Sequence, residues 1–327
     1  MEYRQFGRTG MRVSVLGLGC GGFGGVGSIP ELFGKGEDQA TAFALMNHAW
    51  DAGINYFDTA DSYGGGASEK MIGAWLKERG VRDQLVLSTK VGYAIAEGPN
   101  DQGLSTRHLV EAVEGSLRRL QTDHLDLYVT MEPDSNTPEE ETLRAMDDLI
   151  KSGKVRFIGA SNVSATQLKS SLLTSDRLGL ARYQSVQNGY NLLDREMERE
   201  VLPLAARDTL AVTPFSPTSG GLLTGKYGFG KPPPNDTRLA LRPDPYRSLL
   251  TERTFRSIEA LRSEAEQRGV SIGALSLAWV ISHPAVTAAL IGPRTVTQFK
   301  PWLEAVGIRL SEDERAELAD ALVKAAA

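Results

Sequence analysis

Three residues in this sequence have side chains that together could transfer a proton. Asp58 ends the apolar run "NYFD", Tyr63 follows in the same loop, and Lys90 ends the run "LVLSTK". If they meet in space, Lys90 favours the phenolate form of Tyr63, because an opposite charge stabilises an ionised group. Asp58 would keep Lys90 charged and oriented. A tyrosine in this setting is a general acid for a carbonyl oxygen under reduction, or a base for the reverse reaction.

Each of these residues also has an ordinary structural explanation. A lysine at the end of a buried strand needs a counter-charge, and a structural Asp–Lys pair supplies it. Asp58 could cap the next helix, although Ser68 is better placed for that, and Tyr63 could be a loop aromatic. Taken singly, each residue has a structural role more often than a catalytic one.

Polar and aromatic residues end three later runs of the same kind. Ser161 and Asn162 end "FIGASN", Gln187 ends "YQSVQ" and Phe215 ends "VTPF". Hydroxyl and amide groups suit a carboxamide, and an aromatic ring suits a flat ring, which are the needs of a nicotinamide. The structural alternatives are a helix cap for Asn162, a strand-end hydrogen bond for Gln187 and a core position for Phe215.

Short apolar runs that alternate with helical patterns predict the elements that position these side chains. Eight strands are expected, at residues 13–16, 55–57, 85–89, 125–131, 155–159, 183–187, 210–214 and 288–292. This alternation predicts an α/β fold with eight parallel strands, a (β/α)8 TIM barrel, with an open doubly wound sheet as the runner-up. A barrel would gather the candidate residues at the carboxyl ends of its strands.

The flanking segments complete the expected fold. The opening "RQFGRTGMRVSVLG" predicts a short N-terminal β-hairpin, and residues 225–248, rich in Pro and Gly, predict a long loop. No linker divides the chain, so one domain spans residues 1–327. Capping patterns mark several helix starts, at Asp38, Ser105, Thr137–Glu140, Ser164–Gln167, Thr295–Gln298 and Ser311–Glu314.

The stretch "GLGCGG", residues 17–22, matches the dinucleotide fingerprint of doubly wound folds. That motif requires its third glycine to open a helix whose N-terminus meets the pyrophosphate. Here the chain continues as "FGGVGSIPELFGKGED", which is too rich in Gly and Pro for a helix. We therefore interpret the stretch as a flexible loop beside a site.

Composition excludes several classes of function. The formal net charge is −5, from 36 basic and 41 acidic residues, which disfavours nucleic acid and anionic membranes as partners. No run approaches the length of a membrane span, and the first residues do not form a signal peptide. Cys20 is the only cysteine and the four histidines lack metal-ligand spacing, so we expect no metal site and a cytoplasmic location. The oligomeric state is not indicated.

The chain resembles the aldo-keto reductases over nearly its whole length. The resemblance rests on "LGLGCGGFG", "FDTADSYGGGASEKMIGAWL", "STKVGY", "FIGASN", "SVQNGYNLLDRE", "PFSPTSGGLLTGKY" and "LIGPRTVTQ", which occur in the family's order. It implies a (β/α)8 barrel and NADP(H)-linked interconversion of carbonyls and alcohols. The substrate implied is a small carbonyl or alcohol, which this sequence does not specify.

The resemblance also assigns roles to individual residues. Asp58, Tyr63 and Lys90 match three members of the catalytic tetrad. The residues that match cofactor contacts are Ser161, Asn162 and Gln187 for the carboxamide, Phe215 for stacking, Ser216, Pro217, Gly221, Leu222 and Thr224 for the pyrophosphate, and Gly292, Arg294, Thr295 and Gln298 for the adenosine phosphate. An arginine at a helix N-terminus is also an anion site on physical grounds, which favours NADP over NAD.

Met131 is the main departure from the family pattern. Family members of this type end the fourth strand "DLYxxH", where histidine is the fourth tetrad member, whereas this chain has "DLYVTM". A thioether donates no hydrogen bond and does not titrate. The leading hypothesis is thus a reductase that acts through Tyr63 without the histidine. The alternative is an NADPH-binding regulatory or redox-sensing protein with little turnover.

Overall fold

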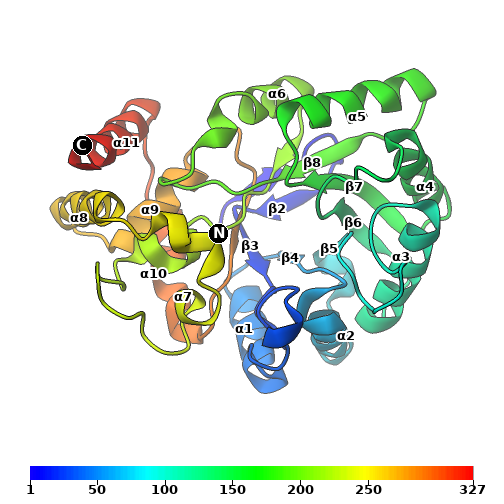
Figure 1. Ribbon diagram of the computed structural model, residues 1–327, viewed down its shortest axis with the longest axis horizontal. Coiled ribbons are helices and arrows are strands. Elements are labelled where there is room, and N and C mark those ends of the chain that lie inside the picture. Colours follow the sequence, from blue (N-terminus) through cyan, green and yellow to red (C-terminus); the bar gives the residue numbers. More distant parts are fainter. Residues whose placement is uncertain (327) are drawn as a thin grey trace.

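Eight parallel strands form one curled sheet at the centre of the computed structural model, which describes residues 1–326 (Figure 1). Their order across the sheet is β10-β3-β4-β5-β6-β7-β8-β9. The strands are β3 (Leu16–Gly19), β4 (Tyr56–Asp58), β5 (Val86–Val91), β6 (Leu125–Thr130), β7 (Val155–Ser161), β8 (Tyr183–Gln187), β9 (Ala211–Val212) and β10 (Ala289–Ile291).

The two edges of this sheet meet through backbone hydrogen bonds. The amide of Thr287 donates to the carbonyl of Val212 at 2.8 Å, and the amide of Leu290 donates to the carbonyl of Pro214 at 2.9 Å. These bonds join the β10 edge to the β9 edge, so no edge is left for a doubly wound sheet. The predicted (β/α)8 fold is confirmed.

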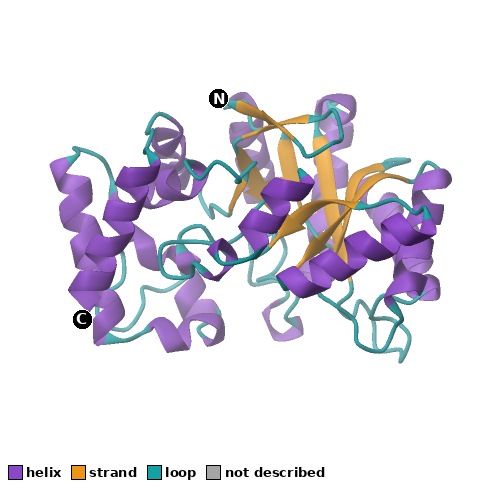
Figure 2. Ribbon diagram, turned by 90° about the horizontal axis from the view of Figure 1, so that it is seen from above, coloured by secondary structure: helices purple, strands orange, loops and turns teal. Residues whose placement is uncertain are grey.

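Helices surround the strands (Figure 2). Six of them connect successive strands from β3 to β9: α1 (Gln39–Asp51), α2 (Ala67–Arg79), α3 (Thr106–Leu120), α4 (Glu139–Lys151), α5 (Ala165–Leu178) and α6 (Val201–Asp208). Between β9 and β10 lie α7 (Arg238–Leu241), α8 (Glu252–Gln267) and α9 (Ile272–Ile281), and after β10 come α10 (Phe299–Val306) and α11 (Glu312–Ala326). Within residues 1–326, none of these helices has the length and apolar character to cross a membrane.

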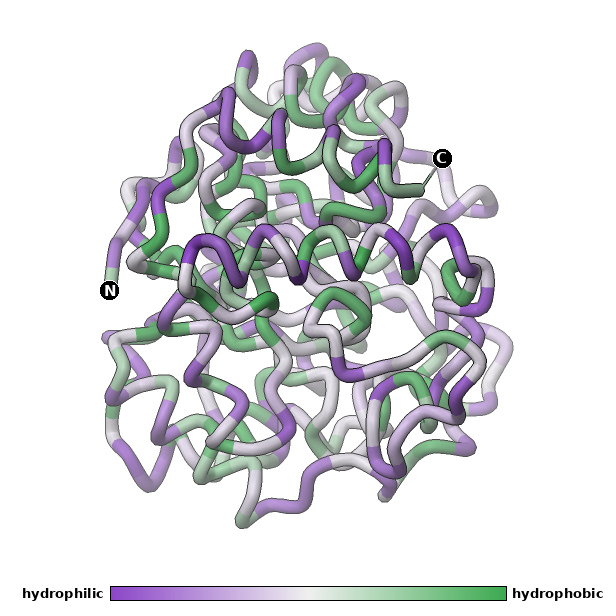
Figure 3. Tube along the Cα trace, turned by 90° about the vertical axis from the view of Figure 1, so that its left-hand side faces the viewer, coloured by the Kyte–Doolittle hydropathy of each residue, from purple (hydrophilic) through white to green (hydrophobic). Residues whose placement is uncertain are grey.

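The helices begin where local capping chemistry allows, with one correction to the sequence prediction. Asp38, Ser105 and Ser164 accept the expected backbone bonds at the starts of α1, α3 and α5. The box expected at Thr137 does not form, because its hydroxyl donates to Asp134 at 2.7 Å and α4 begins without a side-chain cap. Along the helical coils in Figure 3, hydrophilic and hydrophobic segments alternate, as expected when one face meets a core.

An antiparallel hairpin of β1 (Tyr3–Gln5) and β2 (Arg12–Ser14) precedes the barrel, as predicted. The first predicted strand, 13–16, straddles β2 and β3, because the chain leaves the hairpin at Val15. Phe6 and Val13 are fully buried in the inner apolar cluster, and the Phe6 ring meets that of Tyr56 edge-on at 5.9 Å. The hairpin therefore packs against the amino-terminal end of the barrel interior.

Strand alternation explains how the barrel presents polar groups at its opposite end. Successive side chains on a strand point to opposite faces, so every second residue faces inward. The inner apolar cluster includes Tyr56, Val86, Leu127, Val129, Ala211 and Leu290. Continuing the same alternation places Asp58, Lys90 and Met131 on the inner face at the carboxyl ends of β4, β5 and β6.

Candidate active site

A buried ion pair lies at the carboxyl ends of β4 and β5. Lys90 is 1% exposed; its ammonium pairs with the Asp58 carboxylate and donates to the Thr59 carbonyl at 2.8 Å. Burial by itself lowers the pKa of Lys90, but the charge of Asp58, with a further contribution from Tyr63, outweighs burial and leaves that pKa raised. Lys90 is thus held as an ammonium ion.

Tyr63 stands beside this ion pair. It begins the short turn Tyr63–Gly66 that leads into α2, and Nζ of Lys90 lies 5.0 Å from the centre of its ring. On the other side the ring packs near Gly21, where a Cβ would lie 3.3 Å from it. Tyr63 contributes to the raised pKa of Lys90 by its charge and by a side-chain hydrogen bond, so the phenol faces the ammonium. The three predicted catalytic residues therefore lie together.

Met131 occupies the next position around the barrel mouth. It follows β6, it is 4% exposed, and its amide donates to the Val91 carbonyl at 2.7 Å. The Met131 carbonyl accepts a hydrogen bond from Nδ2 of Asn162 at 2.9 Å. The inner side chain at this position is therefore an apolar thioether with no proton to donate.

Three predicted carboxamide contacts lie together on β7 and β8. Nδ2 of Asn162 donates to the Met131 carbonyl at 2.9 Å, and Nε2 of Gln187 donates to Asp58 at 3.0 Å. The Ser161 hydroxyl donates to the Gln187 carbonyl at 2.6 Å. In the part of the chain that the structure describes, neither amide oxygen has a partner, so both are available to the NH₂ group of a carboxamide. Asn162 has φ +55°, a left-handed backbone that is costly for a non-glycine residue and is often found at functional sites.

The segment after β9 forms the next wall of the mouth. Phe215 is half-buried against the inner cluster, and Ser216 has a left-handed backbone with φ +53°. Pro217 is buried, and the Thr224 hydroxyl donates to the Gly221 carbonyl at 2.7 Å. The Leu222 side chain, in contrast, is 1% exposed in the outer core. Its side chain therefore cannot contact a cofactor, and only its backbone is available for the predicted role.

Three cations and one carboxylate gather beside this segment. The pKa of Lys226 is lowered, mainly because its ammonium is desolvated and further by the nearby guanidinium groups of Arg294 and Arg238. Nε of Arg294 donates to Glu37 at 2.6 Å and its Nη1 donates to the Asp236 carbonyl at 2.6 Å. Burial raises the pKa of Glu37, and Arg294 and Arg238 only partly offset this effect. One acid does not balance three cations, so this cluster suits a polyanion such as a dinucleotide.

The sequence interpretation found only part of this cluster. It assigned a phosphate to Arg294, but it missed Glu37 and Arg238, which lie far from each other and from Arg294 along the chain and belong to no predicted motif. Their proximity follows from loop packing alone. Lys226 belongs to the quoted motif "SPTSGGLLTGKY" and could have been selected from it.

The predicted adenosine-phosphate segment follows β10. Its expected capping box is wrong: Thr295 bonds to Thr297 instead, and the Gln298 side chain accepts from the Arg294 amide at 2.9 Å. Gln298 thus shapes the loop that carries Arg294. At Gly292 the nearest atom to a Cβ would be the Gly19 carbonyl oxygen at 3.8 Å, which leaves room for a close approach.

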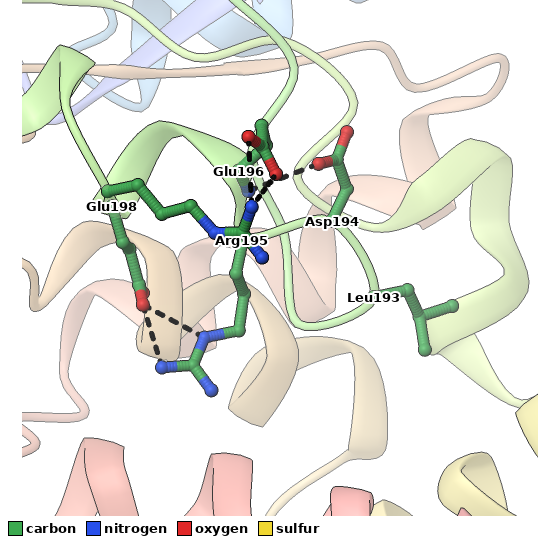
Figure 4. Close-up of a pocket in the computed structure, with 6 residues that line it drawn as sticks. Leu193, Asp194, Arg195, Glu196 and Glu198 are labelled. Carbon is green, nitrogen blue, oxygen red and sulfur yellow. Dashed lines mark hydrogen bonds and ion pairs between the residues drawn. The ribbon is translucent and has the colours of Figure 1, made fainter.

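A hollow of about 500 Å³ lies on the loop between β8 and α6 (Figure 4). The side chains that line it are mostly charged and pair among themselves, as Arg195 does with Glu198 at 2.7 Å. The lining residues are Leu193, Asp194, Arg195, Glu196, Glu198 and Arg199. None of them was a predicted site residue.

Comparison with known proteins gives one consistent result. The model of the Aldo/keto reductase family matches residues 15–323. An uncharacterised oxidoreductase of Bacillus subtilis is 39% identical over 96% of this chain and 93% of its own length. A probable voltage-gated potassium channel subunit beta of Oryza sativa is 37% identical over 94% and 92%. The L-glyceraldehyde 3-phosphate reductase of Escherichia coli is 33% identical over 97% and 91%.

Proposed function

Since the chain belongs to the aldo/keto reductase family, we propose that it is an NADPH-dependent oxidoreductase that interconverts an aldehyde or ketone and an alcohol, with Tyr63 as general acid or base. One observation carries the catalytic assignment: the Lys90 ammonium, paired with Asp58, lies 5.0 Å from the Tyr63 ring. A buried cation beside a phenol favours the phenolate and so eases proton release. The Tyr63 hydroxyl is then the proton donor to the carbonyl oxygen.

The residues at the mouth fit a nicotinamide dinucleotide. The free oxygens of Asn162 and Gln187 suit the carboxamide, and Phe215 offers a ring face. The excess of cations around Arg294 suits phosphates. NADPH carries an adenosine phosphate in addition to the pyrophosphate and NADH does not, so this cluster favours NADPH. When bound, the cofactor supplies the hydride.

The chain itself supplies a proton donor and holds the groups around it in fixed positions in a largely buried site. Asp58 holds Lys90 charged, Lys90 tunes Tyr63, and Gln187 braces Asp58 from the opposite strand. Met131 adds no donor toward the carbonyl oxygen. Losing one positioned donor at a developing oxyanion typically costs about 2.7–4 kcal/mol of barrier. We therefore expect slow turnover of simple aldehydes, or adaptation to a substrate that brings its own activation.

A second candidate function is a cofactor-binding regulatory or redox-sensing protein with little turnover. Met131 favours it, because the site has three potential catalytic groups but lacks a second donor. The name of the Oryza sativa relative, a channel subunit, is compatible with such a role. The intact Asp58–Lys90–Tyr63 group favours the enzyme.

Two measurements separate these functions. NADPH and NADH are first titrated by fluorescence, and NADPH oxidation is then followed with a panel of aldehydes and ketones, with alcohols and NADP⁺ tested in reverse. Binding with turnover that needs Tyr63 supports the enzyme. Tight NADPH binding without turnover of any substrate supports the regulatory protein, and absence of binding contradicts both.

A further inference from the structure

Arg242 lies at the barrel mouth but belongs to no predicted motif. It directly follows α7, and a Cβ on Gly27 would lie 3.0 Å from its Nη1. Gly27 is part of the loop that borders the candidate acid: its amide donates to the Gly21 carbonyl at 2.7 Å, and Gly21 packs near the Tyr63 ring. The guanidinium of Arg242 is therefore next to the loop that covers Tyr63.

The charge of Arg242 is not compensated by the protein. Across residues 1–326 its half-buried side chain forms no ion pair and donates no hydrogen bond to a protein atom. Arg247, on the same segment, pairs with Asp244 at 2.7 Å, and Arg294 pairs with Glu37. A guanidinium has five donors in a planar fork that matches carboxylate and phosphate oxygens. A half-buried one without partners is thus suited to bind an anion.

The Tyr93 hydroxyl lies within reach of the charges of both Arg242 and Tyr63. The Tyr93 hydroxyl, just beyond β5, donates to Glu132 at 3.1 Å. Burial and Glu132 raise the pKa of Tyr93, Tyr63 raises it further, and Arg242 acts in the opposite direction. The charges of Tyr63 and Arg242 therefore both reach one hydroxyl. Glu132 forms no ion pair with Arg242 and so leaves its charge unmatched.

Arg242 is also separate from the cations assigned to the cofactor. Arg294 donates to Glu37 and to the Asp236 carbonyl, whereas the Arg242 guanidinium lies beside Gly27. Arg242 instead acts on Tyr93, on the side of the mouth near Met131 and Glu132. Its position is that of a contact to the substrate rather than to the dinucleotide.

We propose that Arg242 makes this protein selective for carbonyl substrates that carry an anionic group, a carboxylate or a phosphate, near the reacting carbonyl. The inference rests on the proposed reductase function and names its substrate class. Binding energy from a remote charge can orient the reacting group. Such orientation would matter most in a site where Met131 supplies no hydrogen bond to the carbonyl.

The test compares two aldehydes that differ in charge and otherwise by one methyl group. 4-Carboxybenzaldehyde carries a carboxylate, and methyl 4-formylbenzoate is its neutral ester. The ratio of their kcat/KM values with NADPH is measured for the wild type, Arg242→Gln, Arg242→Lys and the control Arg247→Gln. Glyceraldehyde 3-phosphate and glyceraldehyde form a second pair, which reports whether phosphate is recognised as well as carboxylate.

We expect Arg242→Gln to lower the preference for the charged aldehyde about tenfold, the modest end for a charge-assisted bond, because solvent screens a half-buried arginine. Arg242→Lys should keep part of the preference and Arg247→Gln all of it. An unchanged ratio in Arg242→Gln, for both pairs, would overturn the inference.

A binding measurement keeps the inference distinct from the proposed function. The same aldehyde pairs are titrated by calorimetry into protein saturated with NADP⁺, which has no hydride to give, so the heat reports binding alone. If no aldehyde is turned over but Arg242→Gln still loses about tenfold in affinity for the charged probes alone, the anion site stands and the reductase assignment falls. If the wild type turns over both aldehydes and binds them with equal affinity, the reductase assignment stands and the anion site falls.

Discussion

Two buried charge networks in this molecule use similar residues to different ends. One joins Lys90, Asp58 and Gln187 at the barrel mouth. The other joins the loop after β8 to α11, where the Tyr190 hydroxyl donates to Glu198 at 2.6 Å and Arg315 donates to the Tyr190 oxygen at 2.8 Å. Arg195 binds the same Glu198 from the side of the hollow in Figure 4.

The networks differ in what they leave unpaired. In the second, the protein satisfies the Arg315 guanidinium: its Nε donates to the Trp279 carbonyl at 2.9 Å, and its plane lies over the Trp279 ring at 4.6 Å. At the mouth, the amide oxygens of Asn162 and Gln187 have no hydrogen-bond partner within residues 1–326, and the Tyr63 phenol faces the Lys90 ammonium. A buried ion pair alone therefore does not distinguish a functional site from a structural one. Unsatisfied groups beside the pair do.

The largest expected effect is the loss of activity in Tyr63→Phe. Removing the phenol hydroxyl removes the general acid, which typically contributes roughly 10²–10⁴-fold. Cofactor affinity should change little, because the phenol is not proposed to touch the dinucleotide. The melting temperature should fall only slightly, because Asp58 and the Thr59 carbonyl still hold Lys90. The measurement is kcat with NADPH and an activated aldehyde.

The matched control lies in the other network. Glu198→Gln keeps the shape of the side chain but removes its charge, so it should lower the melting temperature and leave kcat unaltered. A Tyr63→Phe enzyme with the wild-type rate, or a Glu198→Gln enzyme with a strongly reduced one, would break the contrast between the networks.

Met131→His should add a hydrogen-bond donor beside the network of Lys90, Asp58 and Gln187 at the barrel mouth. A positioned donor is worth about 2.7–4 kcal/mol at a developing oxyanion, so kcat on a generic activated aldehyde should rise by about a hundredfold to a thousandfold. NADPH affinity should change little. A flat or lower rate would mean that Met131 contacts the substrate specifically. Met131→Leu is the control, since it changes shape without adding a donor.

Arg294→Ala tests the cationic cluster on the cofactor side. An arginine contact to a phosphate is commonly worth about 1.5–3 kcal/mol, and much of the preference for NADPH over NADH should disappear. Because Arg294 also pairs with Glu37, the double variant with Glu37→Gln separates loss of the contact from exposure of a lone buried acid. Unchanged discrimination in both variants would place the phosphate elsewhere, with Arg238 the next candidate.

The smallest expected effect concerns pH and the second network. Burial, with the charge of Arg315, lowers the pKa of His283 to about 4, while Glu198 acts in the opposite direction. An unfolded histidine titrates near pH 6.5, so the unfolded chain takes up the proton first as pH falls. His283 thus contributes stability above about pH 6.5 that is lost progressively toward pH 4.

We expect this loss to be about 1–2 kcal/mol, since partial solvent exposure screens the effect. Urea unfolding at pH 7 and pH 5 measures it, and His283→Asn should lose less stability between the two values than the wild type. An equal loss in both proteins would show that other groups govern acid stability.

Much of the fold was predictable because its signals are local. The 3.6-residue pattern of α3 and the capping box at Ser164 depend only on neighbours in the chain, and both were predicted correctly. The box at Thr137 failed because Asp134 offered a competing acceptor for the same hydroxyl. The start of the first barrel strand failed because an apolar run does not show where the chain turns from the hairpin into the barrel.

The sequence by itself determined the order of strands and helices, the residue types at the strand ends and the absence of histidine at position 131. Strand alternation and a family motif carry that information, because both depend on short separations along the chain. That the proposed site residues act as predicted, and that the chain is one domain, remain predictions. Their chemical types, however, already point to proton transfer beside a cofactor.

Only the tertiary structure decided which groups are paired and which are left open. Gln187 reaches Asp58 across 129 positions, and Arg294 reaches Glu37 across 257. Arg242 lies beside Gly27 because two glycine-rich loops pack against one another at the barrel mouth. Loop conformation has no period in the sequence, and a contact between distant loops depends on the closed barrel that brings their ends together.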